Sequence, residues 1–353
     1  MAHDPSYQRG SGGGPGGAGG EGGGPSMREE RSTIDGFGEA LCEVGRERSE
    51  IVALVADTLK SMGVLAFKES CPERVFDLGI AEQNMIMVAA GLASTGKIVF
   101  AASYAVFLSL RTLEQIRTFI AYPGLKVRIV AGLGGLSGGR DGVTHQGTED
   151  LSLLRAIPNM TVINPADATE VEKAVRALVD WPGPAYLRLS RLKTPVFFSA
   201  DHPFQIGRAN LLQPEGEDVA LVVTGLPVGL ALEASDAMRK EGIGAPVLEF
   251  HTLKPMDKEA LFSLASRCGA VVSIEENNIL GGLGSAVAEL LAESYPVPVF
   301  RVGIADRFSE SASREELWQQ AGLTVENVLA AAKRALALKE AMATRGRKGH
   351  DPR

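Results

Sequence analysis

The feature that most constrains the fold is a regular alternation of short β-branched runs with helical patterns. In the first half, the candidate strands are IVALVAD (51–57), RVFDLG (74–79), IVFAAS (98–103), KVRIVAGL (126–133), TVINPA (161–166) and AYLRLS (185–190). The helical patterns lie at 35–46, 82–94, 107–121, 149–156 and 168–180. Such alternation is typical of parallel sheets that are covered by helices on both faces.

A second alternation begins after a stretch rich in Pro, Gly and charge. Its strand candidates are residues 218–225, 245–253, 270–276 and 297–303, with a helix after the first strand that ends near residue 241. We therefore predict an α/β fold of two doubly wound domains. The expected boundaries are a domain at 29–197, a linker with one edge hairpin at 198–216, and a smaller domain at 217–340. The Gly-rich residues 1–28 and the polar residues 341–353 are expected to be disordered.

Composition excludes several function classes. The net charge of −7 argues against a nucleic-acid surface, which needs a basic face. No apolar run approaches the roughly 18 residues of a membrane span, and no charged leader precedes an apolar stretch. The three cysteines have no metal-ligand spacing, so we expect reduced thiols in a cytoplasm and no metal site in this chain.

Two glycine-rich loops are weak phosphate-binding candidates. GLGGLSGGRDG (132–142) follows a predicted strand but does not match the P-loop pattern or a dinucleotide fingerprint. GGLGSAVAELL (281–291) has its glycines before a helical pattern, and close backbone packing explains these glycines about as well as phosphate binding does.

A carboxylate stands at an unusual place in VFDLGIAEQNMIMVAAGLA (75–93). Glu82 begins a helical pattern whose body is almost entirely apolar. A helix N-terminus favours an anion, so simple capping is one interpretation. A functional carboxylate is the other.

Four blocks identify a family resemblance. DLGIAEQNM, AGLASTGKIVFAASYAVFLSLRTLEQIR, DGVTHQGTEDLSLLRAIPNMTVINPADATE and PAYLRLSR occur in this order. They resemble the C-terminal half of transketolase, particularly the small (beta) subunit of split transketolases. The third block is also similar to deoxyxylulose phosphate synthase. The resemblance covers residues 33 to 335. It implies a pyrimidine-binding domain for thiamine diphosphate, followed by a transketolase C-terminal domain.

The resemblance gives Glu82 the role of the family's activating glutamate. Thiamine chemistry requires the cofactor's C2 to lose a proton to the cofactor's own aminopyrimidine in its imino form. A carboxyl bonded to the pyrimidine ring nitrogen drives that tautomerisation, and a buried site raises the pKa of such a carboxyl. Tyr104 and Phe107 match aromatics that cradle the pyrimidine, and Ile80 is assigned to the same cofactor site.

The other assignments concern the substrate. The resemblance implies that His145 is a catalytic residue that contacts the substrate. Asp141 matches a contact to a sugar hydroxyl, while Ser61 and Arg191 match residues near the distal end of the substrate. Each of three assignments has a structural alternative: a surface ion pair for Arg191, core packing for Phe107 and a surface loop position for His145.

Three departures bear on the substrate. Ile34 stands where split transketolases commonly have an arginine that grips a sugar phosphate, and Leu133 where they have a histidine. Arg140 replaces an acid in the usual GEDG motif. Losing a guanidinium removes a bidentate phosphate contact, so a specialised substrate is expected in place of an ordinary pentose phosphate. Arg140 either supplies a cation for a different anionic group or fills a pocket.

The chain also lacks the GDG motif with which thiamine enzymes hold the diphosphate and its metal. The resemblance therefore implies a partner, an N-terminal-half subunit that binds diphosphate and Mg²⁺, in an α2β2 heterotetramer. Helix 82–94 and the LSLRTLEQIR helix are the expected contact surfaces.

The predicted function is transfer of a two-carbon ketol unit from a ketose-like donor to an aldehyde. The first alternative keeps the cofactor but decarboxylates a 2-oxo acid, as in deoxyxylulose phosphate synthase or oxo-acid dehydrogenase β subunits. A non-catalytic regulatory subunit and a free-standing nucleotide-binding protein are the others.

Overall fold

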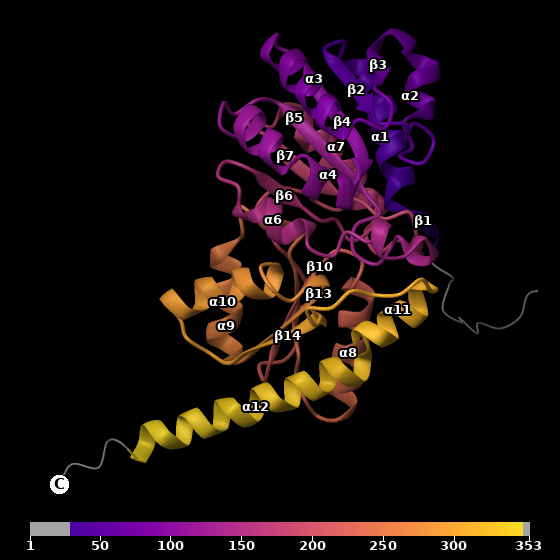
Figure 1. Cartoon of the computed structure of the whole chain (residues 1–353). Helices are drawn as coiled ribbons and strands as arrows, with labels where there is room; N and C mark the ends of the chain where they lie inside the picture. The colour runs from indigo at the N-terminus through magenta and orange to yellow at the C-terminus, as the bar shows by residue number, and fades with distance from the viewer. Residues whose placement is uncertain (1–28, 349–353) are drawn as a thin grey trace, which may run out of the picture.

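The computed structural model describes residues 29–348 and shows two stacked α/β domains (Figure 1). The two predicted domains and their mixed α/β class are confirmed. The expectations for residues 1–28 and 349–353 lie outside the described residues.

A seven-stranded sheet forms the centre of the first domain, in the order β12-β6-β7-β5-β4-β2-β3. Its strands are β2 Ile51–Val55, β3 Val75–Asp77, β4 Ile98–Tyr104, β5 Val127–Gly132, β6 Thr161–Ile163, β7 Ala185–Arg188 and β12 Thr252–Lys254. All the pairings except that of β12 are parallel. The helices are α1 Thr33–Glu47, α2 Leu65–Ser70, α3 Glu82–Ser94, α4 Ala105–Arg111, α5 Leu113–Gln115, a π-helical turn Ile116–Ala121, α6 Asp150–Ala156 and α7 Ala168–Asp180.

The sheet has an apolar core on each face, because successive side chains of a strand point to opposite sides. In β4, Val99 and Ala101 join the core on one face, and Phe100 and Ala102 join the core on the other. The first of these cores continues into the second domain and includes Phe250. The two domains therefore share buried apolar contacts.

The second domain contains a five-stranded sheet in the order β14-β13-β10-β11-β9, with β9 antiparallel at one edge. Its strands are β9 Asn210–Gln213, β10 Ala220–Thr224, β11 Val247–Glu249, β13 Val271–Asn278 and β14 Val299–Ile304. Its helices are α8 Val228–Lys240, α9 Lys258–Cys268, α10 Leu283–Ser294, α11 Arg314–Ala321 and α12 Val325–Lys348. A separate ribbon pairs β1 Glu30–Ser32 with β8 Lys193–Pro195.

Two predicted elements are divided. The expected helix 107–121 is interrupted at Thr112, whose hydroxyl donates to the Leu108 carbonyl (2.6 Å), a bond that competes with helix continuation. The expected strand 245–253 is two strands, and the second, β12, crosses over to pair with β6 of the first-domain sheet. No hairpin forms in 198–216, because β9 pairs with β11 instead.

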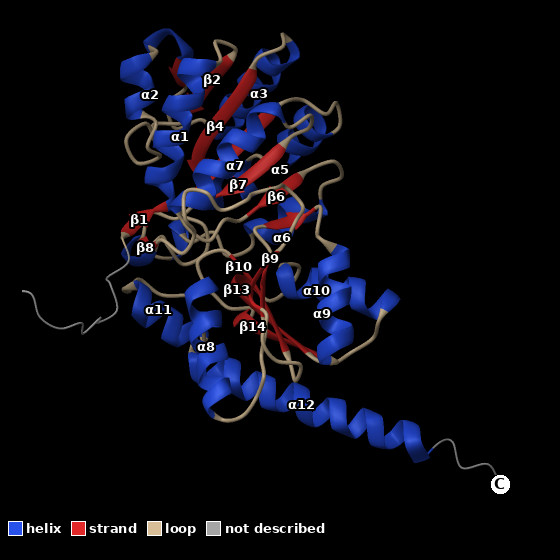
Figure 2. Cartoon of the chain, turned by 180° about the vertical axis from the view of Figure 1, so that it is seen from behind, coloured by secondary structure: helices blue, strands red, loops and turns tan. Residues whose placement is uncertain are grey.

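The predicted disorder of residues 341–353 is wrong for 341–348. Helix α12 continues to Lys348, and its last turns extend beyond the body of the domain (Figure 2). Its first turns are anchored by buried residues such as Val328 and Ala332. The ALALKEAMA stretch that follows consists of strong helix formers, which explains the continuation.

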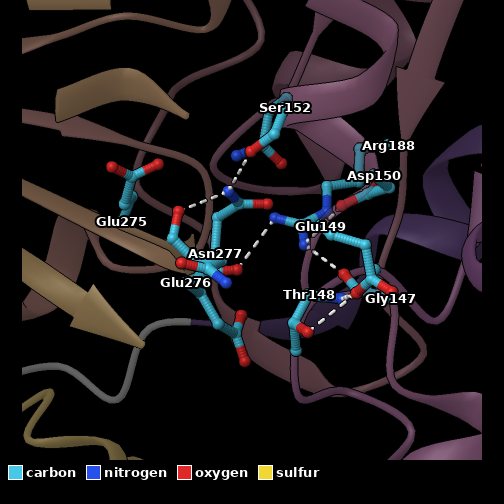
Figure 3. A network of polar contacts seen from close by, with 12 residues as sticks. Gly147, Thr148, Glu149, Asp150, Ser152, Arg188, Glu275, Glu276 and Asn277 are labelled. Atoms are coloured by element: carbon cyan, nitrogen blue, oxygen red, sulfur yellow. Dashed lines mark hydrogen bonds and ion pairs between the residues drawn. The ribbon is translucent and has the colours of Figure 1, made fainter. Parts of the chain in front are cut away.

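A buried polar network connects the two domains (Figure 3). The Arg188 guanidinium contacts the Asp150 carboxylate at 3.0 Å and donates to the carbonyls of Gly147 (2.7 Å) and Glu276 (3.0 Å). A Cβ at Gly134 would lie 2.3 Å from Nε of Arg188. The glycines of loop 132–142 thus allow close packing against this network.

Candidate functional site

Glu82 lies where the sequence predicts it, at the first residue of α3 and after the carboxyl end of β3. Ligand sites in parallel α/β sheets form at this edge. Met85 and Ile86 anchor the first turn in the core. The side chain of Glu82 is only 4% exposed, although a charged helix terminus ordinarily faces water.

Arg111 holds the Glu82 carboxylate. Its Nη1 atom lies 3.0 Å from each carboxylate oxygen, and its guanidinium lies 3.9 Å from the ring centre of Phe107. Arg111 is the last residue of α4, so the break at Thr112 determines where its side chain begins. The sequence alone does not reveal this residue, because the two partners are 29 positions apart and no motif links them.

Three rings gather beside this ion pair. The ring centres of Tyr104, Phe107 and His145 are 5.3–5.8 Å apart, and the Phe107–His145 pair is edge-on. Tyr104 ends β4, Phe107 lies on α4, and His145 ends a short 3₁₀ turn, Val143–His145. The Tyr104 hydroxyl donates to Ser61 Oγ at 3.0 Å, while Nδ1 of His145 lies 2.9 Å from Thr144 Oγ1.

The two residues predicted near the distal end of the substrate are not in one group: Ser61 bonds to Tyr104 of the ring cluster, whereas Arg191 pairs with Asp141, the expected sugar-hydroxyl contact. Arg191 Nη2 contacts a carboxylate oxygen of Asp141 at 2.6 Å and donates to the Gly138 carbonyl at 2.6 Å. Arg140 is exposed beside them. Ile80 is also exposed (75%) and lies outside the buried core, so its assignment to the cofactor site stays a prediction.

Two of the three positions that depart from the family pattern, Ile34 and Leu133, are buried. Ile34 is part of the apolar core on one face of the first sheet, and Leu133 is 2% exposed with a positive φ of 58°. The Cδ1 atom of Ile34 lies 3.5 Å from the position of a Cβ at Gly132. Apolar packing therefore occupies the places of the absent arginine and histidine.

The site suits the aminopyrimidine half of thiamine diphosphate. A flat heterocycle needs apolar faces and a carboxyl partner, and the chain places the Tyr104 and Phe107 rings near a buried carboxylate. Within residues 29–348, no group of three or more His, Cys, Asp or Glu side chains could hold a metal ion. The described residues thus fit the ring of the cofactor but present no metal cluster.

The glycine-rich stretch 281–291 does not form a phosphate site. The Glu275 carboxylate accepts hydrogen bonds from the backbone N–H groups of Leu283 (2.7 Å) and Gly284 (2.9 Å). Burial raises the pKa of Glu275 to about 7. The N-terminus of α10 is thus already capped by a buried side chain, and a Cβ at Gly282 would lie 2.0 Å from its Oε2 atom.

Comparison with known families gives two matches that together cover most of the chain. The family described as "Transketolase, pyrimidine binding domain" matches residues 29–196. The family described as "Transketolase, C-terminal domain" matches residues 207–328.

Individual proteins match over nearly their whole length. The 6-deoxy-6-sulfo-D-fructose transketolase subunit SqwH of Clostridium sp. (strain MSTE9) is 41% identical over 86% of this chain and 94% of its own. A subunit of the apulose-4-phosphate transketolase of Phocaeicola vulgatus is 36% identical over 83% of this chain and 93% of its own. A solved split gene transketolase, an inactive beta4 tetramer, is 44% identical with a TM-score of 0.80, covering 87% and 99% of the two chains. None of the described helices is long and apolar enough to cross a membrane.

Proposed function

This chain belongs to the transketolase family, and from that premise we propose that it is one half of a split, thiamine-diphosphate-dependent transketolase. With its partner it would transfer a two-carbon ketol unit from a ketose-like donor to an aldehyde. The observation that carries the proposal is the buried Glu82 carboxylate beside the Tyr104–Phe107–His145 ring cluster.

Each residue has a role that follows from its place. When bound, the cofactor would supply the nucleophilic carbon for the transfer of the ketol unit. Glu82 would hold a proton at the pyrimidine ring nitrogen, and the rings of Tyr104 and Phe107 would position the heterocycle and exclude water. His145, in contact with both rings of the cluster, would orient a substrate oxygen or exchange its proton.

Exposed apolar side chains on the elements around Glu82 support the need for a partner. Six exposed large apolar side chains lie on β3, in the loop before α3, on α3, on α4, and in or directly after the π-helical turn: Phe76, Ile80, Met87, Leu110, Phe119 and Tyr122. Contiguous exposed apolar surface usually marks an interface. We assign it to an N-terminal-half subunit that binds the diphosphate and Mg²⁺, in an α2β2 assembly. The inactive state of the β4 relative agrees with a β chain that needs such a partner.

The substrate is expected to carry an anionic end that is not held as in ordinary transketolases. The substrates for which the two relatives are named carry a sulfonate in one case and a phosphate in the other. In this chain, Ile34 and Leu133 are packed in the core and offer no cation or ring nitrogen to such a group.

The variant Glu82→Gln tests this function directly. It keeps the size of the side chain but removes the acid, so we expect turnover of the complex to fall by about 10²–10⁴-fold. The matched control is Glu259→Gln, on the exposed face of α9 in the second domain, with turnover near that of the native complex. Unchanged turnover in Glu82→Gln would contradict the proposal. Carbon dioxide release from pyruvate by the native complex would instead indicate decarboxylating chemistry.

A further inference from the structure

A cavity of about 350 Å³ lies where the two domains meet, next to the Asp141–Arg191 pair. Three segments line it. The first domain contributes Ser137, Gly139 and Arg140 from one loop and Arg191–Lys193 from another, and the second domain contributes residues 312–315 at the start of α11.

The lining is strongly cationic. Arg140, Arg191, Lys193 and Arg314 line the cavity, and Glu315 is the one acidic residue among the lining side chains. Among the described residues, the side chains of Arg140, Lys193 and Arg314 form no ion pair. Arg314 instead stacks on the ring of Trp318, with 4.3 Å between the guanidinium carbon and the ring centre. Several unpaired cations around one cavity attract an anion.

The walls of the cavity are tied together across the domain boundary. The Ser311 hydroxyl donates to the Arg140 carbonyl. The Gln146 side-chain amide donates to the carbonyls of Gly139 (3.2 Å) and Glu310 (3.0 Å). The cationic side chains therefore project from backbones whose relative positions are held by hydrogen bonds, which lowers the cost of ordering them around a ligand.

We propose that this cavity binds the anionic terminal group of the substrate, a tetrahedral oxyanion, through Arg140, Lys193 and Arg314. The identity of the ligand as substrate rests on the proposed function. The cavity begins at Arg191, whose partner Asp141 is the expected contact to a sugar hydroxyl. The carbon chain of a substrate that extends past Asp141 would therefore reach the cationic side chains. Planar guanidinium groups donate two hydrogen bonds to such oxyanions. Arg314 makes the second domain part of the binding site.

Anion binding can be tested on the chain alone, because all the lining residues belong to it. The chain has two tryptophans, so ¹⁵N-tryptophan labelling gives two indole signals, and Trp181→Phe assigns them. We expect inorganic phosphate to shift the Trp318 signal saturably, while sodium chloride at the same ionic strength does not. Arg140→Glu should raise the half-saturating concentration at least about tenfold. Arg46→Gln removes an exposed cation of α1 that forms no ion pair within residues 29–348, and it should leave this concentration unchanged.

A titration with methanesulfonate distinguishes the two kinds of substrate that could carry the oxyanion, a sulfonated one and a phosphorylated one. Comparable binding of methanesulfonate and phosphate points to a sulfonated substrate, and much tighter binding of phosphate points to a phosphorylated one. A shift that follows ionic strength alone, or an Arg140→Glu variant that titrates like the native chain, would overturn the proposal.

Kinetics of the complex supply an independent readout. Arg140→Glu should raise KM for an anionic ketose donor about tenfold or more, with little change in kcat, because the contact is remote from the reacting carbon. If the complex turns over no ketose, the proposed function fails. A saturable, Arg140-dependent titration would then still establish the anion site.

Discussion

At the scale of single residues, the central feature is that the Glu82 carboxylate already has a partner within its own chain. Arg111 contacts both carboxylate oxygens while its guanidinium covers the Phe107 ring. The same arginine thus touches two residues proposed to bind the cofactor. Its side chain is about half exposed, whereas that of Glu82 is almost fully buried. Arg111 is therefore placed to fix the orientation of the carboxylate before the partner and the cofactor bind.

Arg111→Met should destabilise the lone chain. The change leaves a buried carboxylate without a cation, and we expect the free energy of unfolding to fall by about 2 kcal/mol, between the values for exposed and buried pairs. Urea unfolding measures this loss. Arg117→Met is the control, because it removes an exposed arginine from the next turn that has no ion pair among the described residues. Equal stability of the two variants would mean that the Glu82–Arg111 ion pair contributes nothing to the free energy of unfolding.

At the scale of elements, the glycine loop after β5 determines how the two domains fit together. A Cβ at Gly134 would meet the Arg188 side chain, whose guanidinium contacts Asp150 and carbonyls from both domains. A close approach of this kind is possible only without a side chain.

The variant Gly134→Ala should therefore lower the free energy of unfolding by about 2 kcal/mol, because the buried ion pair has no room to shift. Gly91→Ala is the matched control. Gly91 lies inside α3, and apart from the adjacent backbone of this helix no described atom lies within 4 Å of the position that an added methyl group would take. Alanine there should stabilise by about 0.5–1 kcal/mol. Thermal unfolding measures the change in stability of each variant relative to the native chain, and we expect the two changes to have opposite signs. A Gly134→Ala variant that unfolds like the native chain would contradict this role of the loop.

A second junction, between α7 and β11, contains two buried carboxyls. The Asn210 amide donates to Glu170 (3.2 Å) and to Glu249 (2.7 Å). Burial raises the pKa of Glu249 to about 8 and holds that of Glu170 well above its ordinary value, and the nearby Asp167 acts in the same direction. The folded chain therefore keeps protons here that the unfolded chain releases.

This arrangement predicts stability that decreases as pH rises. Between the ordinary pKa of a glutamate, near 4.5, and about 8, the folded state binds more protons at Glu249 than the unfolded state. The free energy of unfolding should then fall by about 1.4 kcal/mol per pH unit for this group. Glu249→Gln removes the effect, so its stability relative to the native chain should improve from pH 5.5 to 8.5 in urea unfolding. The exposed Glu293→Gln is the control, and parallel pH profiles for native and Glu249→Gln proteins would disprove the argument.

At the scale of the whole molecule, the sequence predicts the strand and helix order well, because alternation and apolar periodicity are local signals. Helices 82–94 and 168–180 end where predicted. The crossing of β12 into the first-domain sheet was not predictable, because nothing local to residues 245–253 indicates which sheet a short strand joins. The full length of α12 was not predicted, because its polar, basic end resembles a solvated tail even though the residues before it are strong helix formers.

For the site, the motif residues were accessible from the sequence and their partners were not. The position of Glu82 follows from its place between a strand and an apolar helix. Arg111 and the cationic cavity depend on contacts between segments that are distant in the sequence, including α11 of the second domain. Such contacts leave no periodic or spacing signal in a single chain.

The central claim is that this chain supplies only half of the cofactor site. Its most direct test is a calorimetric titration of thiamine diphosphate with Mg²⁺ into two samples. One is the chain alone and the other is its complex with the N-terminal-half partner. We predict tight binding by the complex and none by the lone chain, because the chain supplies the carboxylate and the rings but its described residues contain no metal cluster. Equally tight binding by the lone chain, or no binding by the complex, would contradict it.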